Sequence, residues 1–165
     1  MKARHAILVV LAAAFTLTSI AAAGPDAAKQ RVSITFPKAK ASPVSRFVLT
    51  PLLTGPIKQD SGTATAVWGP GRDVMREVQK ISIAEDITTY KGKRGSLTIR
   101  ERSEWVDVSN ENAPGFDFRP GVAMGTWKVV RGTGQYTGVT GGGRSAHAGM
   151  GQEWFARQEG FLTGS

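Results

Sequence analysis

The chain has 165 residues, with 21 Lys and Arg against 13 Asp and Glu, a net charge of +8 at pH 7, and no cysteine. This length suits one ordinary domain and is too short for two. The lack of cysteine excludes disulfides, thiolate nucleophiles, thiol redox chemistry and cysteine-based zinc sites.

Residues 1–23 have the composition of a secretory signal peptide. Lys2 and Arg4 give a basic start, an uncharged apolar stretch follows over 6–20, and three alanines ending at Ala23 supply the small residues that signal peptidase reads. About 15 apolar residues make a helix of only about 22 Å, too short for a bilayer core. We therefore expect cleavage after Ala23, a secreted or periplasmic bacterial protein, and no transmembrane segment after processing.

The remaining segment, 24–165, is predicted to form a single domain. It keeps 19 basic and 13 acidic residues, a net charge of +6, with a mild cluster of cations at Lys91, Lys93 and Arg94. A solvated basic surface accounts for this excess. The alternative is attraction to anionic envelope polymers or lipid head groups. Nucleic acid is not expected as a partner.

Short strands separated by glycine and proline dominate the sequence after residue 30. In 31–36 polar and apolar residues alternate, which places Val32, Ile34 and Phe36 on one face of a strand. Further strand segments are predicted, in chain order, over 44–50, 60–68, 74–90 (two strands, or one long strand with a bend), 96–108, 122–131, 144–150 and 153–162. The helical candidate is a short turn at 74–78. The segment 109–120 is predicted to be a long exposed loop.

This pattern predicts an all-β fold, either a sandwich or a closed barrel. Closure removes the exposed strand edges that a secreted sheet must otherwise protect. The strand count is close to eight. The expected fold class is therefore a single antiparallel, eight-stranded, closed β-barrel spanning 24–165.

Six of the twelve residues from Gly132 to Gly143 are glycine. The part that begins at Gly138 differs by one residue from a phosphate-binding loop, with Arg144 in place of lysine. That loop works only where a helix follows and its N-terminus holds the phosphates, whereas a strand is predicted here. We expect no nucleotide. The run is instead predicted to form a tight turn at 132–134 and a second bend over 138–143.

The glycine run also carries a family resemblance, which covers about residues 92 to 164. It resembles the signature G-T-G-x-[YF]-x-G-[LAV]-x-G-x-G of allene oxide cyclase-like and dirigent-like barrels, including small secreted bacterial members. The matching residues are Gly125-Thr-Trp127, Gly132-Thr-Gly134-Gln-Tyr136-Thr-Gly138-Val-Thr-Gly141-x-Gly143 and the upstream Gly95-Ser-Leu-Thr-Ile-Arg100.

The resemblance implies an eight-stranded antiparallel barrel with an apolar interior, often a homodimer or homotrimer. In plant allene oxide cyclases the cavity holds a fatty-acid epoxide and steers its ring closure, and in dirigent proteins it orients phenolic radicals. No acid of this chain aligns with those catalytic positions, so the resemblance implies a fold and no site. It assigns a structural role to Gly125, Gly132, Gly134, Gly138, Gly141 and Gly143.

Glu101 is the candidate catalytic residue. Strict alternation over 96–105 groups it with Leu97, Ile99 and Trp105 on one face of a strand. A carboxyl group on an apolar face would be desolvated, which raises its pKa and makes it a usable acid or base. A slip of one residue would move it to the opposite face.

Glu101, Trp105, Tyr136 and Arg157 are the candidate ligand-binding residues. Arg157 belongs to a set of alternating charged and aromatic residues over 153–161. If this set faces outward, it forms a solvated ladder of charges. If it faces the lumen, it forms a polar anchor for a ligand. His147 is the only histidine after processing, and we expect it to be a partly exposed strand residue without a catalytic role. We expect no metal and no cofactor.

Three functions remain open. The leading hypothesis is a non-catalytic exported barrel that binds a small apolar ligand or a protein partner. The second is a cyclase, isomerase or dirigent-type enzyme that acts on a hydrophobic substrate through Glu101. The third is a basic envelope protein that binds polyanions. An enzyme of this kind requires a cavity of roughly several hundred Å³ with a buried ionisable group.

Overall fold

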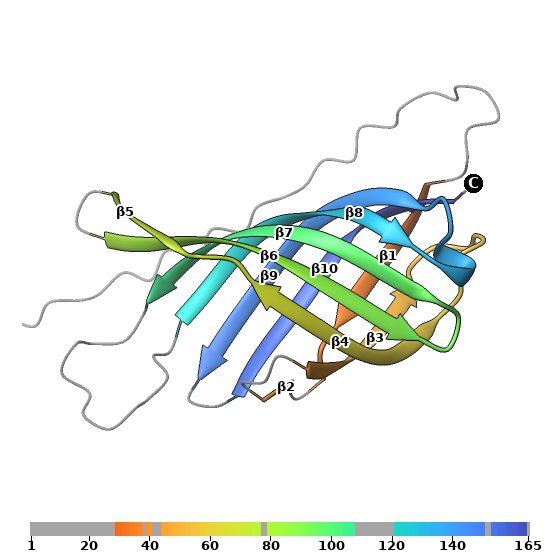
Figure 1. The fold of residues 1–165 in the computed structure, drawn as a ribbon, viewed down its shortest axis with the longest axis horizontal. Helices are drawn as coiled ribbons and strands as arrows, with labels where there is room; N and C mark the ends of the chain where they lie inside the picture. The colour runs from red at the N-terminus through yellow and green to blue at the C-terminus, as the bar shows by residue number, and fades with distance from the viewer. Residues whose placement is uncertain are drawn as a thin grey trace, which may run out of the picture.

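The computed structural model describes residues 29–37, 39–40, 44–76, 79–107, 121–150 and 153–164. The predicted signal peptide (1–23) and the predicted loop over 109–120 lie outside these residues. The described residues form ten strands and one 3-10 turn (Figure 1), namely β1 (Lys29–Thr35), β2 (Ala39–Lys40), β3 (Val44–Pro51), β4 (Asp60–Trp68), β5 (Arg72–Arg76), β6 (Gln79–Gly92), β7 (Ser96–Asp107), β8 (Gly121–Gly132), η1 (Gly134–Tyr136), β9 (Thr140–Met150) and β10 (Glu153–Thr163).

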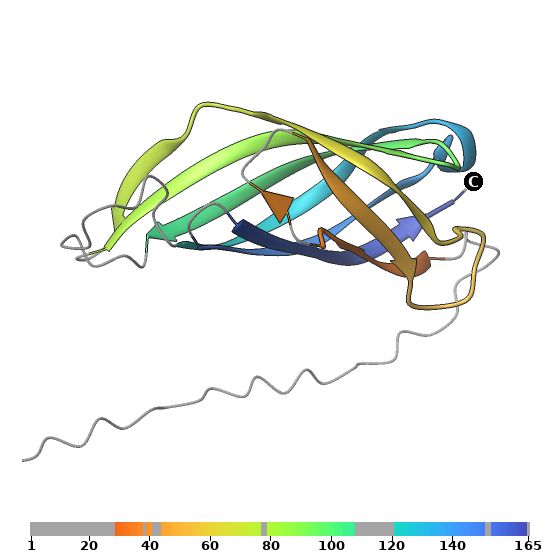
Figure 2. The same ribbon diagram turned by 90° about the horizontal axis from the view of Figure 1, so that it is seen from below.

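Eight of these strands close into an antiparallel barrel (Figure 1 and Figure 2). Their order around the barrel is β1, β3, β4, β6, β7, β8, β9 and β10, and β10 pairs with β1 to complete the ring. β2 pairs with the start of β10, and β5 pairs with the first part of β6. The all-β, closed, eight-stranded antiparallel barrel predicted from the sequence is confirmed.

β6 is long because two different strands pair with it. β5 pairs with Gln79–Ile83, and β4 pairs with Asp86–Gly92. The prediction of two strands within 74–90 is therefore confirmed. The predicted helical turn at 74–78 is wrong over its described part, because Val74 and its neighbours pair with β6 as a strand.

Apolar side chains fill much of the barrel interior. Most of them come from alternate positions of the strands, as the period of two requires, and Ile57, Tyr136 and Val139 come from the connecting segments. The buried cluster consists of Val32, Ile34, Phe36, Phe47, Leu49, Ile57, Ala64, Tyr90, Leu97, Ile99, Trp127, Tyr136, Val139, Ala156 and Leu162. No helix of the described residues is long and apolar enough to cross a membrane.

One end of the barrel is closed by side chains and two connecting segments. In both views the segment between β3 and β4 lies at the same end as the turn between β8 and β9 (Figure 1 and Figure 2). The buried Gln30 amide donates to the carbonyls of Leu53 at 2.8 Å and Ile57 at 2.9 Å. The Tyr136 hydroxyl donates to Asp60 at 3.1 Å. These contacts fix Ile57 and Tyr136 across this end.

The glycine run divides between a turn and a strand. Gly134 and Gly138 have φ values of +61° and +71°, which an L side chain rarely adopts. The predicted second bend over 138–143 is wrong in its second half, because Thr140 to Gly143 begin β9. A Cβ atom at Gly143 would clash with the carbonyl oxygen of Glu159, so glycine lets β9 lie close to β10 there.

Candidate functional site

Glu101 faces the interior of the barrel and is 1% exposed. The alternation that groups it with Leu97 and Ile99 holds along β7. A register shift does occur beside it, between Thr98 and Ile99 in the pairing of β7 with β8. The extra residue, Val130, lies on β8, so β7 keeps its alternation.

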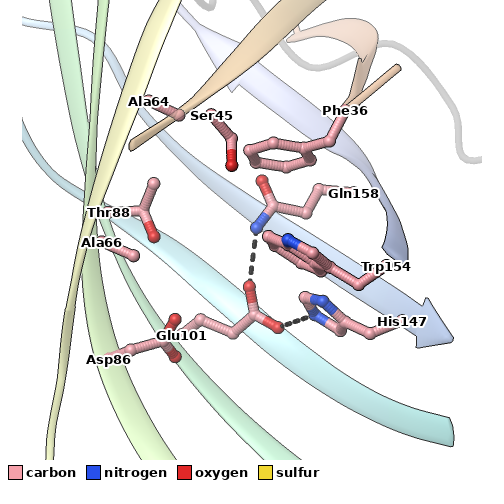
Figure 3. Close-up of a pocket in the computed structure, with 10 residues that line it drawn as sticks. All are labelled: Phe36, Ser45, Ala64, Ala66, Asp86, Thr88, Glu101, His147, Trp154 and Gln158. Carbon is pink, nitrogen blue, oxygen red and sulfur yellow. Dashed lines mark hydrogen bonds and ion pairs between the residues drawn. The ribbon is translucent and has the colours of Figure 1, made fainter. Parts of the chain in front are cut away.

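Three polar side chains contact the Glu101 carboxylate directly. The Ser145 hydroxyl donates to Oε1 at 2.6 Å. His147 Nε2 lies 2.5 Å from the same oxygen (Figure 3). The Gln158 amide donates to Oε2 at 2.6 Å. The Tyr90 hydroxyl in turn donates to Gln158 Oε1 at 2.5 Å. All five side chains are buried.

These neighbours reverse the expected titration of Glu101. Burial acts to raise its pKa, but the hydrogen bond and charge of His147 act against it. The hydrogen bonds from Ser145 and Gln158 act in the same direction as His147, and the pKa of Glu101 falls below its usual value. The predicted raised pKa of Glu101 is therefore wrong. The polar groups come from β9 and β10, which the alternation along β7 does not reveal.

Asp86 is a buried acid that the sequence reasoning missed. It lies opposite Glu101 in the pairing of β6 with β7. Burial and the negative charge of Glu101 raise the pKa of Asp86 to about 7. Its parity with Thr88 and Tyr90 along β6 is the one sequence signal that places it on the inner face.

Two atoms of this cluster have no hydrogen-bond partner. Asp86 Oδ1 and His147 Nδ1 are both buried and unpaired within the part of the chain that the structure describes. His147 is 8% exposed, so the expectation of a partly exposed histidine is wrong. The His147 side chain points into the barrel lumen from the same face of β9 as Ser145. An unpaired buried polar atom is unusual and requires an explanation.

Aromatic rings surround His147. Trp154 stacks on the imidazole with a centroid separation of 5.9 Å and an interplanar angle of 12°. The ring centroid of Trp105 lies 5.8 Å from that of the imidazole, with an interplanar angle of 39°. The ring centroids of Trp68 and Phe36 lie 6.5 Å and 5.4 Å from that of Trp154. Trp68 is 50% exposed, so this aromatic cluster extends from the interior to the surface.

A small cavity lies between the acids and the aromatic cluster. Asp86, Glu101, His147 and Trp154 contribute to its wall (Figure 3). The volume open to water inside it is about 20 Å³. This is room for one water-sized group and far below the volume of a typical substrate pocket. The cavity can therefore accept a small polar head group, while the rest of a ligand must lie outside it.

Gly125 makes room for the cluster on the β8 side. A Cβ atom there would lie 2.6 Å from the carbonyl oxygen of Arg102, 2.7 Å from Ser145 Oγ and 3.1 Å from Glu101 Oε1. Such separations are too short for a carbon atom. A side chain at this position would force the Ser145 hydroxyl and the Glu101 carboxylate to move, so glycine permits their hydrogen bond.

The structure separates the four candidate ligand-binding residues. Glu101 and Trp105 lie at the cavity and its aromatic cluster. Tyr136 lies at the closed end, with Asp60. Arg157 faces outward with a 61% exposed side chain and pairs with Glu159, so the ladder over 153–161 is the solvated one. Within the described ranges, no group of three or more His, Asp and Glu could hold a metal ion.

The described residues thus define an up-and-down antiparallel barrel, closed at one end, with a buried carboxylate–histidine cluster beside a group of tryptophans. No protein-family model, curated protein or solved structure matches the chain.

Proposed function

We propose that the protein is an exported, non-catalytic barrel that binds a small, mostly apolar ligand. The ligand places a hydrogen-bond donor, such as an ammonium, hydroxyl or amide N–H group, in the cavity beside Asp86 and His147. Its planar apolar body lies against Trp68 and Trp154. The observation that carries this proposal is the pair of unpaired buried atoms, Asp86 Oδ1 and His147 Nδ1. Each unpaired atom costs about 1–3 kcal/mol, which a ligand donor at Asp86 would offset.

The two carboxyl groups of the cluster support a donor or cation over an anion. Glu101 is ionised at neutral pH because its pKa is lowered, and Asp86 is partly ionised because its pKa is about 7. Aromatic faces add attraction for a cation within about 6 Å of the ring centroid. A carboxylate ligand would instead meet like charge in a desolvated site.

The finer barrel type is also part of this proposal. The positive-φ glycines Gly134 and Gly138, and the close approach at Gly143, lie in the segment that resembles the allene oxide cyclase-like and dirigent-like signature. These positions support membership of that type. Fold analogy supplies no ligand, so the ligand class is argued from the acids and the aromatic cluster alone.

The first test is native mass spectrometry of the protein purified without denaturation. We expect a bound small molecule, and the same spectrum gives the subunit number. The second test is titration of tryptophan fluorescence with benzylamine, benzyl alcohol and benzoate, which share one ring. Benzylamine and benzyl alcohol should bind, and benzoate should not.

Two variants make this test specific to the lumen. Asp86→Asn should reduce the preference for benzylamine over benzoate, because only the charge of Glu101 then remains. Glu85→Gln removes a carboxylate from the exposed outer face of the same strand and should leave the preference unchanged. Equal binding of benzoate, or an unchanged preference in Asp86→Asn, would contradict the proposal.

A second candidate function is acid–base catalysis. The cavity of about 20 Å³ is far below the several hundred Å³ expected for such an enzyme, so the substrate would have to lie mostly outside the cavity. Catalysis is favoured by one observation: the adjacent carboxyl groups of Glu101 and Asp86 have pKa values displaced in opposite directions. Such a pair is typical of acid–base sites, and Asp86 is the group that would exchange a proton near pH 7. The test is deuterium exchange into phenylacetone in D2O, followed by NMR. Exchange that Asp86→Asn abolishes would favour the enzyme, and its absence would favour simple binding.

A further inference from the structure

A cluster of cations lies on the outer wall of the barrel, away from the lumen site. It consists of Arg100 and Arg102 on β7, Lys128 on β8 and Arg144 on β9, which we call the basic face. These three strands are adjacent in the sheet (Figure 1). All four side chains are exposed and occupy the strand positions that alternate with the inward ones.

The strand register brings these cations together. Arg100 lies directly opposite Lys128, and Thr126 lies between Arg102 on one side and Arg144 on the other. Like charges in directly opposite positions destabilise a sheet. The basic face is therefore not explained by the stability of the barrel.

The acids on the β7 side leave the basic face unneutralised. Glu104 lies two residues from Arg102 on β7, but both of its oxygens accept from Arg76 at 3.0 Å. Glu85 lies opposite Arg102 in the pairing of β6 with β7. It forms no ion pair with Arg100 or Arg102 in the described part of the chain.

The acid on the β9 side is also engaged elsewhere. Glu159 lies opposite Arg144 in the pairing of β9 with β10. It is bound by Arg31 at 3.1 Å and by Arg157. Arg144 consequently has no acidic partner among the described residues, and the four cations keep an excess of positive charge.

The surface between these side chains is hollowed. One hollow, of about 310 Å³, is lined by Arg102, Glu104, Thr126 and Arg144 together with Met124 and Gly125. A second, of about 270 Å³, is lined by Glu85, Arg100, Arg102 and Lys128 together with Thr126 and Trp127. Arg102 and Thr126 belong to both. Guanidinium groups donate paired hydrogen bonds to oxyanions, and a threonine hydroxyl adds a further donor.

We propose that the basic face binds a linear polyanion that carries phosphate groups, two of which occupy the adjoining hollows and share Arg102. Two linked anions use both hollows at once, which a single phosphate cannot do. The net charge of +6 expected after removal of residues 1–23 adds long-range attraction for a highly charged chain. Glu104 lines the first hollow and Glu85 the second. A flexible chain can place its phosphates at the guanidinium and ammonium groups and away from these carboxylates, which a continuous anionic membrane surface cannot do. This site is independent of the lumen ligand.

The test is fluorescence anisotropy with labelled long-chain inorganic polyphosphate at salt concentrations from about 50 to 200 mM. We expect binding whose log K falls linearly with log salt concentration, with a slope that reflects about four phosphate contacts. Arg102→Gln should weaken binding about tenfold at the lowest salt and reduce the slope by about one.

Two control variants locate the effect. Arg46→Gln removes an exposed cation from β3, on the opposite wall of the barrel, and should change affinity less than about twofold. Asp86→Asn in the lumen should leave polyphosphate affinity unchanged, so that failure of this proposal and failure of the lumen proposal are distinguishable.

Several outcomes would overturn the proposal. The first is no binding of polyphosphate at the lowest salt concentration. The second is an equal loss of polyphosphate affinity in Arg46→Gln and Arg102→Gln. The third is competition by orthophosphate that is as effective, per phosphate group, as competition by unlabelled polyphosphate. Binding to phosphatidylglycerol vesicles without binding to polyphosphate would assign the face to a membrane instead.

Discussion

Asp86 and Glu101 face each other across β6 and β7 as two carboxyl groups in one lumen. Their pKa values move apart because only Glu101 receives hydrogen bonds from Ser145, His147 and Gln158. Asp86 is left with burial and the neighbouring negative charge, and its pKa rises to about 7. Near neutral pH the pair therefore exchanges one proton, mainly at Asp86.

The stability of the Asp86→Asn variant relative to the wild type should increase as pH rises. The pKa of Asp86 is about 7 in the folded state against 3.8 unfolded, so its protonated form stabilises the fold fully below pH 3.8. That contribution is lost as pH rises through 7. The unfolding free energy of the variant minus that of the wild type should grow by about 3 kcal/mol between pH 4 and 8. Urea denaturation across this range measures it, and a difference independent of pH would contradict it.

The control for this prediction is Glu85→Gln. Glu85 precedes Asp86 on β6 and is exposed, so the same change of charge occurs outside the lumen. The stability of this variant relative to the wild type should depend only weakly on pH.

Glu101→Gln should destabilise the barrel and lower the pKa of Asp86. The carboxylate accepts three hydrogen bonds, and an amide presents only one oxygen to those donors. We expect a loss of about 2–3 kcal/mol in unfolding free energy. The charge of Glu101 raises the pKa of Asp86. In the variant, carbon-13 NMR of the Asp86 side-chain carboxyl carbon should therefore show titration at a lower pH. An unchanged Asp86 titration would rule out this coupling.

Gly125→Ala should destabilise the barrel and disturb the Glu101 cluster. The new methyl group meets the carbonyl oxygen of Arg102 at 2.6 Å and Ser145 Oγ at 2.7 Å. Relief of such contacts costs about 1–3 kcal/mol. Gly71→Ala is the matched control, since the nearest atom to a Cβ there is 3.9 Å away. Chemical denaturation of both variants gives the comparison, and equal losses would show that steric contact at Gly125 is not the cause.

Tyr90→Phe should be more destabilising than Tyr136→Phe. The first change leaves the buried Gln158 Oε1 without the hydroxyl that donates to it, at about 1–2 kcal/mol. The second removes one donor from Asp60, which still accepts from the backbone of Ser61 and Lys93 at 2.9 Å. We expect a loss below about 1 kcal/mol there. Thermal denaturation of both variants tests the order, which the reverse ranking would contradict.

The fold could be predicted because alternation and turn residues act locally. The segments 31–36 and 96–105 show their inner faces directly, and Glu101 was identified as inward-facing for this reason. The Gly69-Pro-Gly71 break likewise separates β4 from β5. These features need no knowledge of which strand lies beside which.

The site could be predicted only in part because its members meet through strand register. Along β6 the hydrophobic pattern misleads: Ile87 is 39% exposed, whereas Asp86 is 6% exposed. Nothing local to Asp86 shows that Glu101 lies opposite it. Likewise His147 could be assigned to a face of its strand, but the identity of that face as the lumen depends on closure of the whole ring.

The contacts of Gln30 and Tyr136 close one end of the barrel, so the cavity beside Asp86 lies nearer the other end among the described residues. If the proposed ligand binds there, we expect it to enter and leave by the end that carries Trp68 and Trp154. Residence time would then be governed by how readily those rings turn aside, so substitutions of Trp68 or Trp154 would change dissociation and association rates together.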